Sequence, residues 1–405
     1  MSRDSNGLSI GLLLAITAFV SPIFAAILAL VLFAGKPSKS MAVVASVGIA
    51  FAAGFAAHGI EYKHAMDMTR WMEECAYYDG QDILSIVTSS NADHNGLIVW
   101  NLVCWLVGNS GDLHLLQSIA AFIGYGLMSW LMLDKAAEEK TTLPVLLQIL
   151  LLVFLAVPTQ TIVCSVRSTL GCIICSVAFY TRKSYSLKDS LPGAALVALS
   201  CLLHSSMVVV FAIFAAQPLI ARFPIKASII LAVGIVILVE GSTLLVSTGL
   251  FSSVPLLGKA LEKAAFYTTG TEWDREQMAQ LLPNISHVLV MLFLILLYAR
   301  VRVAGQTDGL TAVTLAMIAC VIGMELTLVN VGNRFRVVPI IIGSMQLLNN
   351  QGREIPTRNR WVPLADKALL VLALGICLIS MRSFIPSFNS TEVMMYMVFY
   401  PLSFF

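Results

Sequence analysis

Charged residues are scarce in this chain. Asp, Glu, Lys and Arg make up only 12% of its 405 residues, while 58% are hydrophobic and the mean hydropathy is +0.86. A soluble globular chain carries about 25% charged residues, so a water-covered surface and intrinsic disorder are both excluded. The net charge of +2 leaves no basic surplus with which to bind nucleic acid. The class that remains is a multi-spanning membrane protein.

The sequence also has no pattern typical of a disulfide framework or of a metal site. All cysteines except Cys75 lie in or beside apolar segments, which argues against a disulfide framework. The CxxC at Cys172 and Cys175 falls inside such a segment, where cysteine usually packs as a small apolar residue. The six histidines form no HExxH motif and no tight His/Cys cluster. We therefore expect no metal site and no cofactor.

Long apolar runs predict an all-α fold. A helix needs about 20 apolar residues to cross a hydrocarbon core about 30 Å thick. Long runs lie near residues 8–34, 41–60, 113–133, 143–163, 228–250, 310–331 and 366–384. Shorter runs lie near residues 168–180, 285–299 and 336–350, and the run 191–221 suits a hairpin of two helices. Residues 1–405 are thus expected to form a single integral membrane domain of about twelve transmembrane helices with short re-entrant or interfacial helices.

The first run is too long for the apolar part of a signal peptide, so we expect it to remain as a helix. The positions of Lys and Arg then predict the orientation, because short loops rich in these residues face the cytoplasm. With the N-terminus outside, the inner loops carry a surplus of Lys and Arg, and the outer segments a surplus of acids. Two large polar segments, residues 61–112 and 251–284, then lie outside, and we expect the chemistry there.

The apolar stretch 97–107 is too short to cross the bilayer, so it should lie on the outer leaflet or dip into it. The C-terminal sequence STEVMMYMVFYPLSFF has the same character. A tilted crossing is the alternative for both segments.

Three arginines stand beside apolar helix, where an unpartnered charge is costly. Arg167 lies in TQTIVCSVRSTLG, and Arg334 and Arg336 lie in VGNRFRVVPI. An Arg at the centre of a span costs about 2.5–3.5 kcal/mol on insertion scales, so such residues usually have a partner. The partner is either water at the interface, reached by snorkelling, or a bound anion, since guanidinium groups bind phosphate oxygens bidentately.

A histidine and a set of aromatic and acidic residues lie on the same predicted outer face. His204 lies in LSCLLHSSMVVV beside Ser205 and Ser206, and it is either a packed histidine or a catalytic group. The two outer segments mix carboxylates with aromatic rings, which suits either sugar binding or an amphipathic helix at the headgroups. These residues are Trp71, Glu73, Glu74, Tyr77, Tyr78, Asp79 and Asp82 in the first segment, and Phe266, Tyr267, Glu272, Trp273, Asp274 and Arg275 in the second.

The block from IVCSVRSTLG through TRKSYSLKDS to ALVALSCLLHSSMVVVF resembles the EpsG family of Wzy-like bacterial polysaccharide polymerases. In that family an Arg opens one helix, a basic inner loop follows, and the next helix ends in His and Ser. Arg167, Arg182 with Lys183, and His204 with Ser205 occupy these places. Weaker matches at Asp82 in GQDILSIV and Arg334 in NRFR extend the resemblance over residues 75–345. The chain departs from the family at Asn95 and Gly96, where a Glu-Pro pair is usual, and it lacks a tyrosine soon after Asp82.

The resemblance implies a GT-C-like polymerase in the bacterial cytoplasmic membrane, with its active face outward. It would join oligosaccharide repeat units carried on undecaprenyl pyrophosphate, with a flippase and a chain-length regulator as candidate partners and without metal. The resemblance and the residue patterns together give Arg167, His204, Glu74, Asp79 and Asp82 as the expected catalytic residues. They give Trp71, Tyr78, Ser205, Trp273, Arg334 and Arg336 as the expected substrate-binding residues. In this interpretation the arginines hold the pyrophosphate, and His204 or a carboxylate of the first outer segment removes the proton from the attacking sugar hydroxyl.

Three other functions remain open from the sequence. An O-antigen ligase would use the same lipid carrier but attach finished chains to a lipid core. A flippase for lipid-linked oligosaccharides would need a chain of cations through the membrane, whereas only Glu240 and Glu325 lie deep in predicted spans. A structural subunit of an export complex would need no catalytic residues.

Overall fold

A computed structural model describes residues 2–60, 67–88, 97–224, 241–248, 281–303, 308–327, 334–348 and 361–384, together with isolated positions between 226 and 237, residue 265 and residue 332. In this part of the chain the regular structure is entirely helical. The helices are α1 (Ser2–Val20), α2 (Pro22–Gly35), α3 (Lys39–His58), α4 (Asp67–Ala76), α5 (Ser85–Thr88), α6 (Ile98–Gly108), α7 (Leu115–Glu139), α8 (Leu143–Ala156), α9 (Thr159–Cys164), α10 (Val166–Thr181), α11 (Leu187–Leu203), α12 (Met207–Arg222), α14 (Ser242–Ser247), α17 (Leu281–Val303), α18 (Gly309–Thr327), α20 (Val337–Leu348) and α21 (Trp361–Phe384).

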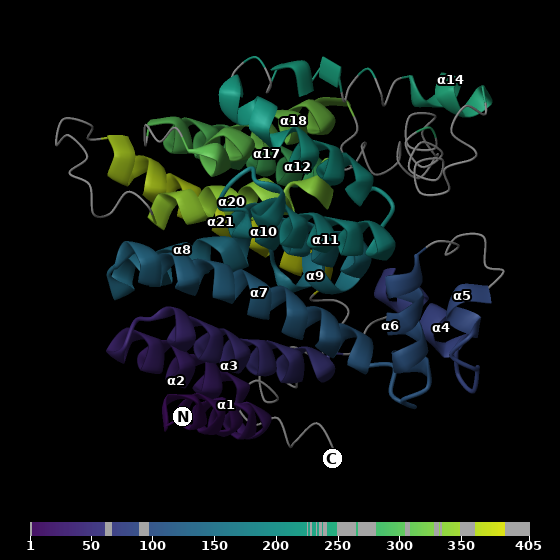
Figure 1. The fold of residues 1–405 in the computed structure, drawn as a ribbon, viewed down its shortest axis with the longest axis vertical. Helices are drawn as coiled ribbons and strands as arrows, with labels where there is room; N and C mark the ends of the chain where they lie inside the picture. The colour runs from purple at the N-terminus through teal and green to yellow at the C-terminus, as the bar shows by residue number, and fades with distance from the viewer. Residues whose placement is uncertain are drawn as a thin grey trace.

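Four of these helices are long and apolar enough to cross a membrane. They are Lys39–His58, Leu115–Glu139, Ile285–Val303 and Trp361–Ser380. Shorter apolar helices pack beside them, and most helices run side by side in one bundle (Figure 1). Large apolar side chains remain exposed around this bundle, such as Leu12, Val31 and Leu374, as expected for a surface that faces lipid. The chain is therefore a multi-pass membrane protein.

The first predicted span, residues 8–34, consists of two antiparallel helices. Helix α1 ends at Val20, and Ser21 has extended backbone (φ −147°, ψ 99°) before Pro22 starts α2. Leu14 of α1 and Ala29 of α2 both lie against Gly48 of α3. One helical turn further along α3, Ala52 clusters with Ala18 and Ala25. From the first group to the second the residue number rises in α1, from 14 to 18, and falls in α2, from 29 to 25, so the two helices are antiparallel.

This hairpin also corrects the predicted position of the N-terminus. Because α1 and α2 are antiparallel, α1 begins at the same end of the bundle as the turn between α2 and α3, which carries Lys36 (Figure 1). The prediction placed the N-terminus on the other side of the membrane from Lys36 and is wrong. The predicted sides of the later loops are not affected, since they rest on the positions of Lys and Arg and the start of α3 keeps its predicted side.

The central helices follow the predicted pattern with one additional break. The run 191–221 is a helical hairpin, as predicted, made of α11 and α12 with a turn at His204. The predicted span 143–163 is interrupted where α8 ends at Ala156 and Pro158 caps the short helix α9. Of the predicted span 228–250, the structure describes α14 and a few isolated positions.

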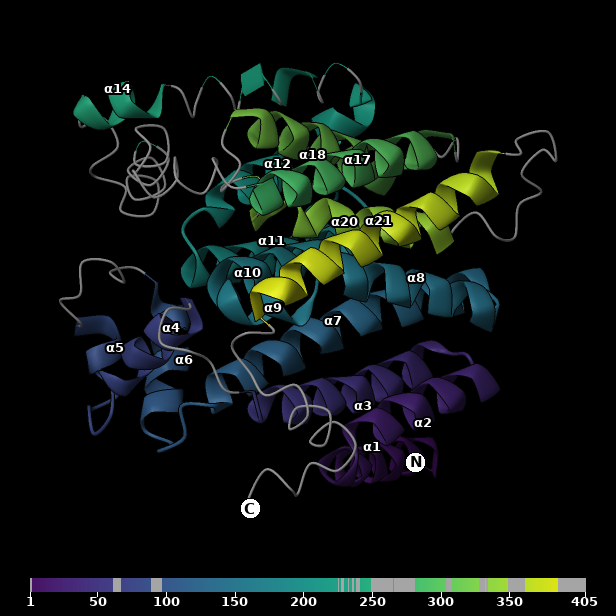
Figure 2. The same cartoon turned by 180° about the vertical axis from the view of Figure 1, so that it is seen from behind.

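Helices α4, α5 and α6 form a separate group at one end of the bundle, with α6 lying crosswise to the long helices (Figures 1 and 2). We call this the α6 end. Gly108 brings α6 against α4, because a Cβ at this position would lie 2.1 Å from the Cys75 carbonyl oxygen. The eleven-residue length of α6 agrees with the prediction that residues 97–107 do not cross the bilayer.

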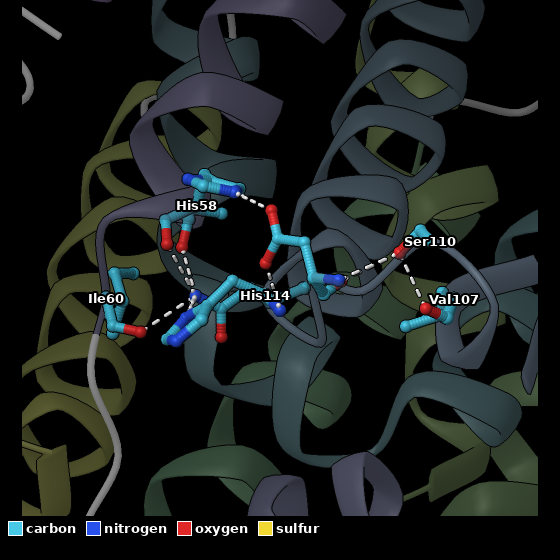
Figure 3. Close-up of polar contacts among 8 residues, drawn as sticks. His58, Ile60, Val107, Ser110 and His114 are labelled. Carbon is cyan, nitrogen blue, oxygen red and sulfur yellow. Dashed lines mark hydrogen bonds and ion pairs between the residues drawn. The ribbon is translucent and has the colours of Figure 1, made fainter. Parts of the chain in front are cut away.

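Polar contacts join the helices at both ends of the bundle. At the α6 end, His58 Nε2 lies 2.8 Å from Asp112, and Gln117 Nε2 donates to the Ala57 and Ile60 carbonyls, which connects α7 to the end of α3 (Figure 3). At the opposite end, Arg300 of α17 makes two hydrogen bonds to Asp366 of α21, at 2.7 and 3.2 Å. These contacts join α3 to α7 at one end of the bundle and α17 to α21 at the other.

Candidate functional site

Arg167 is the buried cation at the start of α10. The backbone turns at Ser165, between α9 and α10, and the Thr169 hydroxyl donates to the Thr161 carbonyl at 2.8 Å. This turn places Arg167 in the first turn of α10 with its side chain beneath α4 and α6. Only 5% of Arg167 is exposed to solvent.

Two tryptophans enclose the Arg167 guanidinium. Its Cζ lies 4.0 Å from the Trp71 ring centroid and 5.2 Å from that of Trp100. The rings meet edge to face at 5.6 Å. Trp71 Nε1 donates to the Cys164 carbonyl and Trp100 Nε1 donates to Glu74, so each ring is held in place. Such stacking stabilises a cation where water is excluded.

The charged side chains around Arg167 carry more positive than negative charge. Glu74 attracts Arg167, but it also pairs with Arg70 at 3.7 Å, and both Arg70 and Arg334 repel Arg167. Arg167 Nε and Nη1 have no hydrogen-bond partner among the described residues. Buried guanidinium N–H groups are costly to leave unsatisfied, and an anion is the kind of group that could accept hydrogen bonds from them. We call Arg70, Trp71, Glu74, Trp100 and Arg167 the Arg167 cluster.

The segment before α20 adds two further arginines to this end of the bundle. The Arg334 carbonyl accepts a hydrogen bond from the Cys172 thiol at 3.4 Å, which holds this segment against α10. Arg336 is buried, and its backbone N–H donates to the Gly332 carbonyl. The predicted grouping of Arg334 with Arg167 is therefore present in the structure, and it is carried by the contact between α10 and the segment before α20.

Arg336 lies beside a histidine and a glutamate that were not predicted as site residues. His287 Nδ1 of α17 is 2.8 Å from Glu325 Oε2 of α18. The Glu325 side chain has no exposed surface, while the His287 side chain is 23% exposed. Arg336 attracts Glu325 and repels His287. An acidic residue in the predicted span 310–331 was the signal for Glu325, and no sequence pattern pointed to His287.

Glycine is required where the chain passes Glu325. A Cβ at Gly332 would lie 2.7 Å from both Cγ and Cδ of Glu325 and 2.9 Å from its backbone nitrogen. The backbone at Gly332 thus covers the carboxyl group and separates it from water. It also fixes the start of the segment that carries Arg334 and Arg336.

His204 lies in the turn between α11 and α12, where it is buried together with Ser205. Its Nδ1 accepts a hydrogen bond from the Ser206 backbone N–H at 3.2 Å and lies 2.6 Å from the Ser206 hydroxyl. Helix α11 contacts α10, and Met207, directly after this turn, approaches Cys172 of α10 with its sulfur at 3.9 Å. The turn therefore lies on the same side of α10 as the Arg334 carbonyl.

The remaining predicted residues are placed differently. Trp71 and Tyr78 are buried, whereas the neighbouring Tyr77 is 56% exposed. Asp79 and Asp82 are exposed, and among the described residues no hydrogen bond or ion pair joins either to Arg167; Asp82 Oδ1 accepts the Leu84 N–H instead. Trp273 and its neighbours in the second outer segment lie outside the described residues. Within the described part of the chain, no group of three or more His, Cys, Asp or Glu residues could hold a metal ion.

The fold and the Arg167 cluster define a class: a multi-pass membrane protein with a buried, positively charged site at one end of its helical bundle. The chain matches the EpsG family over residues 70–354, which include every residue of that site. This match covers most of the chain, so the chain belongs to the EpsG family and is a polymerase-like membrane protein of polysaccharide biosynthesis. The comparisons with curated proteins and with solved structures gave no match.

Proposed function

We propose that this protein is a glycosyltransferase that lengthens a polysaccharide from oligosaccharide repeat units carried on undecaprenyl pyrophosphate, without a metal ion. The observation that carries the proposal is Arg167: a cation that is buried, stacked on two tryptophans and left with two nitrogens, Nε and Nη1, without a hydrogen-bond partner within the described residues. A guanidinium in this state is prepared for a phosphate group. Its place at the end of an apolar bundle suits a diphosphate attached to a membrane lipid.

The arginines would assist departure of the leaving group. As the bond between sugar C1 and the diphosphate oxygen breaks, negative charge grows on the diphosphate. Arg167 and Arg334, with Arg336 two residues after Arg334, would be fixed by the folded structure before this charge appears, so no reorganisation would be needed. No nucleotide is required, because the sugar-phosphate bond already holds the energy for transfer.

His204 would serve as a hydrogen-bond donor in this site. Since its Nδ1 accepts the Ser206 N–H, the neutral ring carries its proton on Nε2 and can donate it to an oxygen of the substrate. Glu74 and Trp71 would orient Arg167 instead of touching the sugar, and Tyr78 would support them from the core. The exposed Tyr77, Asp79 and Asp82 would contact the glycan where it leaves the site.

We propose that the α6 end faces away from the cytoplasm in a bacterial inner membrane. The positive-inside tendency supports this orientation, because the opposite end carries many cations. They are Lys36, Lys39, Lys135, Lys140, Arg182, Lys183, Lys188, Arg222, Arg300 and Arg302. A GT-C-like arrangement, and contacts with a flippase and a chain-length regulator, belong to the same proposal.

The test replaces Arg167 in the intact protein, reconstituted in vesicles with lipid-linked repeat units. Arg167→Ala should lower the polymerisation rate by about 10²–10³, because a preorganised donor to the developing charge is lost. Arg167→Lys should recover only part of the rate, since the ammonium group keeps the charge and loses the planar fork. Gel analysis of the released glycan measures chain length.

Arg302→Ala is the matched control, because Arg302 is an exposed arginine at the opposite end of the bundle. It should polymerise at the rate of the unsubstituted protein. Normal chain length in Arg167→Ala would overturn the role of Arg167. Transfer of finished chains to a lipid core without lengthening would overturn polymerisation in favour of ligation.

A further inference from the structure

We propose that Cys75 of α4 and Cys104 of α6 are the site of a disulfide bond, which fixes the two helices that carry the tryptophans of the Arg167 cluster. This inference goes beyond the proposed function, and it rests on the orientation proposed there for the α6 end. It follows from the packing of α4 on α6, from the contact between the two thiols, and from the side of the membrane on which that orientation places them.

Helices α4 and α6 face each other along a matched stripe of residues. At the start of the stripe the Trp71 and Trp100 rings meet edge to face, with their centroids 5.6 Å apart. Cys75 and Cys104 each follow the tryptophan of their own helix by four residues, so each lies on the same helix face as that ring. One turn further along α6, a Cβ at Gly108 would lie 2.1 Å from the Cys75 carbonyl oxygen. The two cysteines therefore occupy facing positions on neighbouring helices.

The two thiols are in contact. The Cys104 side chain shares a hydrogen bond with the Cys75 side chain. Neither residue has any exposed surface, and both are free thiols in this structure. A hydrogen bond between thiols is weak, whereas a disulfide brings the sulfurs to about 2.05 Å. Since the sulfurs already meet from facing positions, the bond needs only a small movement of the side chains.

The proposed orientation places this pair on the oxidising side of the membrane. Cys104 stands in an apolar run, which in the sequence argued against a disulfide framework. Helix α6 has only eleven residues, too few to cross the bilayer, so Cys104 lies with Cys75 at the α6 end. Disulfides form and persist outside the cytoplasm, where no thiol buffer keeps cysteines reduced.

The bond acts on Arg167 through the two helices. Cys104 interacts electrostatically with both Arg167 and Glu74, so the cysteine pair lies beside the Arg167 cluster. Helix α4 carries Trp71 and α6 carries Trp100, and these two rings enclose the guanidinium. A covalent bond one helical turn from the ring contact holds the spacing between the helices, and with it the spacing between the rings.

The step balances as a thiol–disulfide exchange. The oxidant is a protein disulfide of a thiol oxidoreductase outside the cytoplasm. One cysteine thiolate attacks that disulfide, and the second thiolate resolves the mixed disulfide. The bond between Cys75 Sγ and Cys104 Sγ forms, two electrons and two protons leave the cysteines, and the donor disulfide is reduced to two thiols. Because both sulfurs are buried in the folded protein, the exchange takes place before α4 and α6 close on each other.

The experiment counts protected thiols in the full-length protein. Cells are quenched with acid, and free thiols are alkylated in denaturant with N-ethylmaleimide. The protein is then reduced and labelled with a maleimide that carries a polyethylene glycol chain. Of the eight cysteines, two should gain this label after reduction, and none should gain it without reduction. Mass spectrometry of the unreduced digest of the unsubstituted protein should show the peptides of Cys75 and Cys104 linked to each other.

Cys75→Ala and Cys104→Ala should each remove both labels, because either change leaves the other cysteine as a free thiol. Cys320→Ala is the matched control, since Cys320 is a buried cysteine of a different helix, α18, and this variant should keep both labels. Cys104→Ala should also melt about 5 °C below Cys320→Ala in detergent, because the chain between residues 75 and 104 is no longer closed into a loop in the unfolded state.

If reduction adds no label to the unsubstituted protein, or if Cys75→Ala still gains two labels, the disulfide is overturned. A linkage of either cysteine to another protein would overturn it as well. Polymerisation in vesicles by the same preparation tests the proposed function separately. Polymer without protected thiols contradicts only the disulfide, and protected thiols without polymer contradict only the proposed function, so the two failures are distinguishable.

Discussion

Arg167 and Trp71 illustrate what single residues in the sequence can and cannot predict. An arginine beside apolar helix is conspicuous, so Arg167 could be singled out from the sequence alone. Trp71 was predicted as a platform for sugars, but the structure places its ring against the Arg167 guanidinium. Trp100 was not singled out at all. These residues lie far apart in the chain, and no spacing pattern reports a contact between three separate helices.

At the same scale, Gly108→Ala should disturb the Arg167 cluster without touching it. The added Cβ would lie 2.1 Å from the Cys75 carbonyl oxygen, a backbone atom, so α6 must move away from α4 and carry Trp100 with it. Overpacking of this kind costs about 1–3 kcal/mol of unfolding free energy. We expect a lower melting temperature in detergent and reduced polymerisation.

Gly35→Ala serves as the control, because nothing lies within 4 Å of a Cβ at that position. Equal melting temperatures and equal polymerisation for Gly108→Ala and Gly35→Ala would contradict the role of Gly108.

Among the elements, the hairpin α11–α12 was predictable and the hairpin α1–α2 was missed. The run 191–221 is too long for one crossing, which forces a turn. The run 8–34 could cross as one tilted helix, and only Ser21 and Pro22 mark the break that the structure shows. The joint between α3 and α7 could not be predicted either, since it depends on the Gln117 side chain reaching three backbone carbonyls at the end of α3.

This joint should weaken in acid. Burial on its own would raise the pKa of Asp112, but the hydrogen bond with His58, the His58 charge and the His114 N–H outweigh burial and lower it. A lowered native pKa means that the stabilisation is present above the unfolded value of about 3.9 and is lost as the pH falls through the native value. The melting temperature of the unsubstituted protein should therefore fall between about pH 5 and about pH 2 more steeply than that of Asp112→Asn.

Asn at position 112 keeps the size of the side chain and has no proton to gain in this range, so it isolates the titration of this one carboxyl group. Parallel melting curves for the two proteins across the range would exclude Asp112 as the source of the acid sensitivity.

At the scale of the whole molecule, the sequence predicts the distribution of charge, and it predicts the location of the site only in part. Within the described residues, the helix ends that border the predicted inner loops lie together at the end opposite to α6, as a common side requires (Figure 1). The contact of His287 with Glu325 could not be foreseen, because Glu325 stands out as an acid in an apolar span but no sequence pattern points to His287.

The orientation of the whole molecule can be tested by cysteine labelling in intact cells. Ser110→Cys, in the exposed turn between α6 and α7, should react with a membrane-impermeant maleimide added outside. Ser184→Cys, exposed between α10 and α11, should react only after the membrane is permeabilised. The unsubstituted protein gives the background from its own cysteines, most of which are buried. The reverse labelling pattern would place the Arg167 cluster in the cytoplasm and rule out the proposed orientation.

The antiparallel pairing of α1 with α2 predicts which N-terminal deletions the protein tolerates. Because α1 and α2 run antiparallel, the pair begins and ends at the same end of the bundle, so α3 starts from that end whether the pair is present or absent. Removal of α1 and α2 together should leave the orientation of α3 and all later helices unchanged. It would remove the packing of Leu14 and Ala29 against Gly48. Loss of α1 alone would leave one helix fewer before α3. If the shortened chain still began on the cytoplasmic side, every later loop would lie on the side that its Lys and Arg content disfavours.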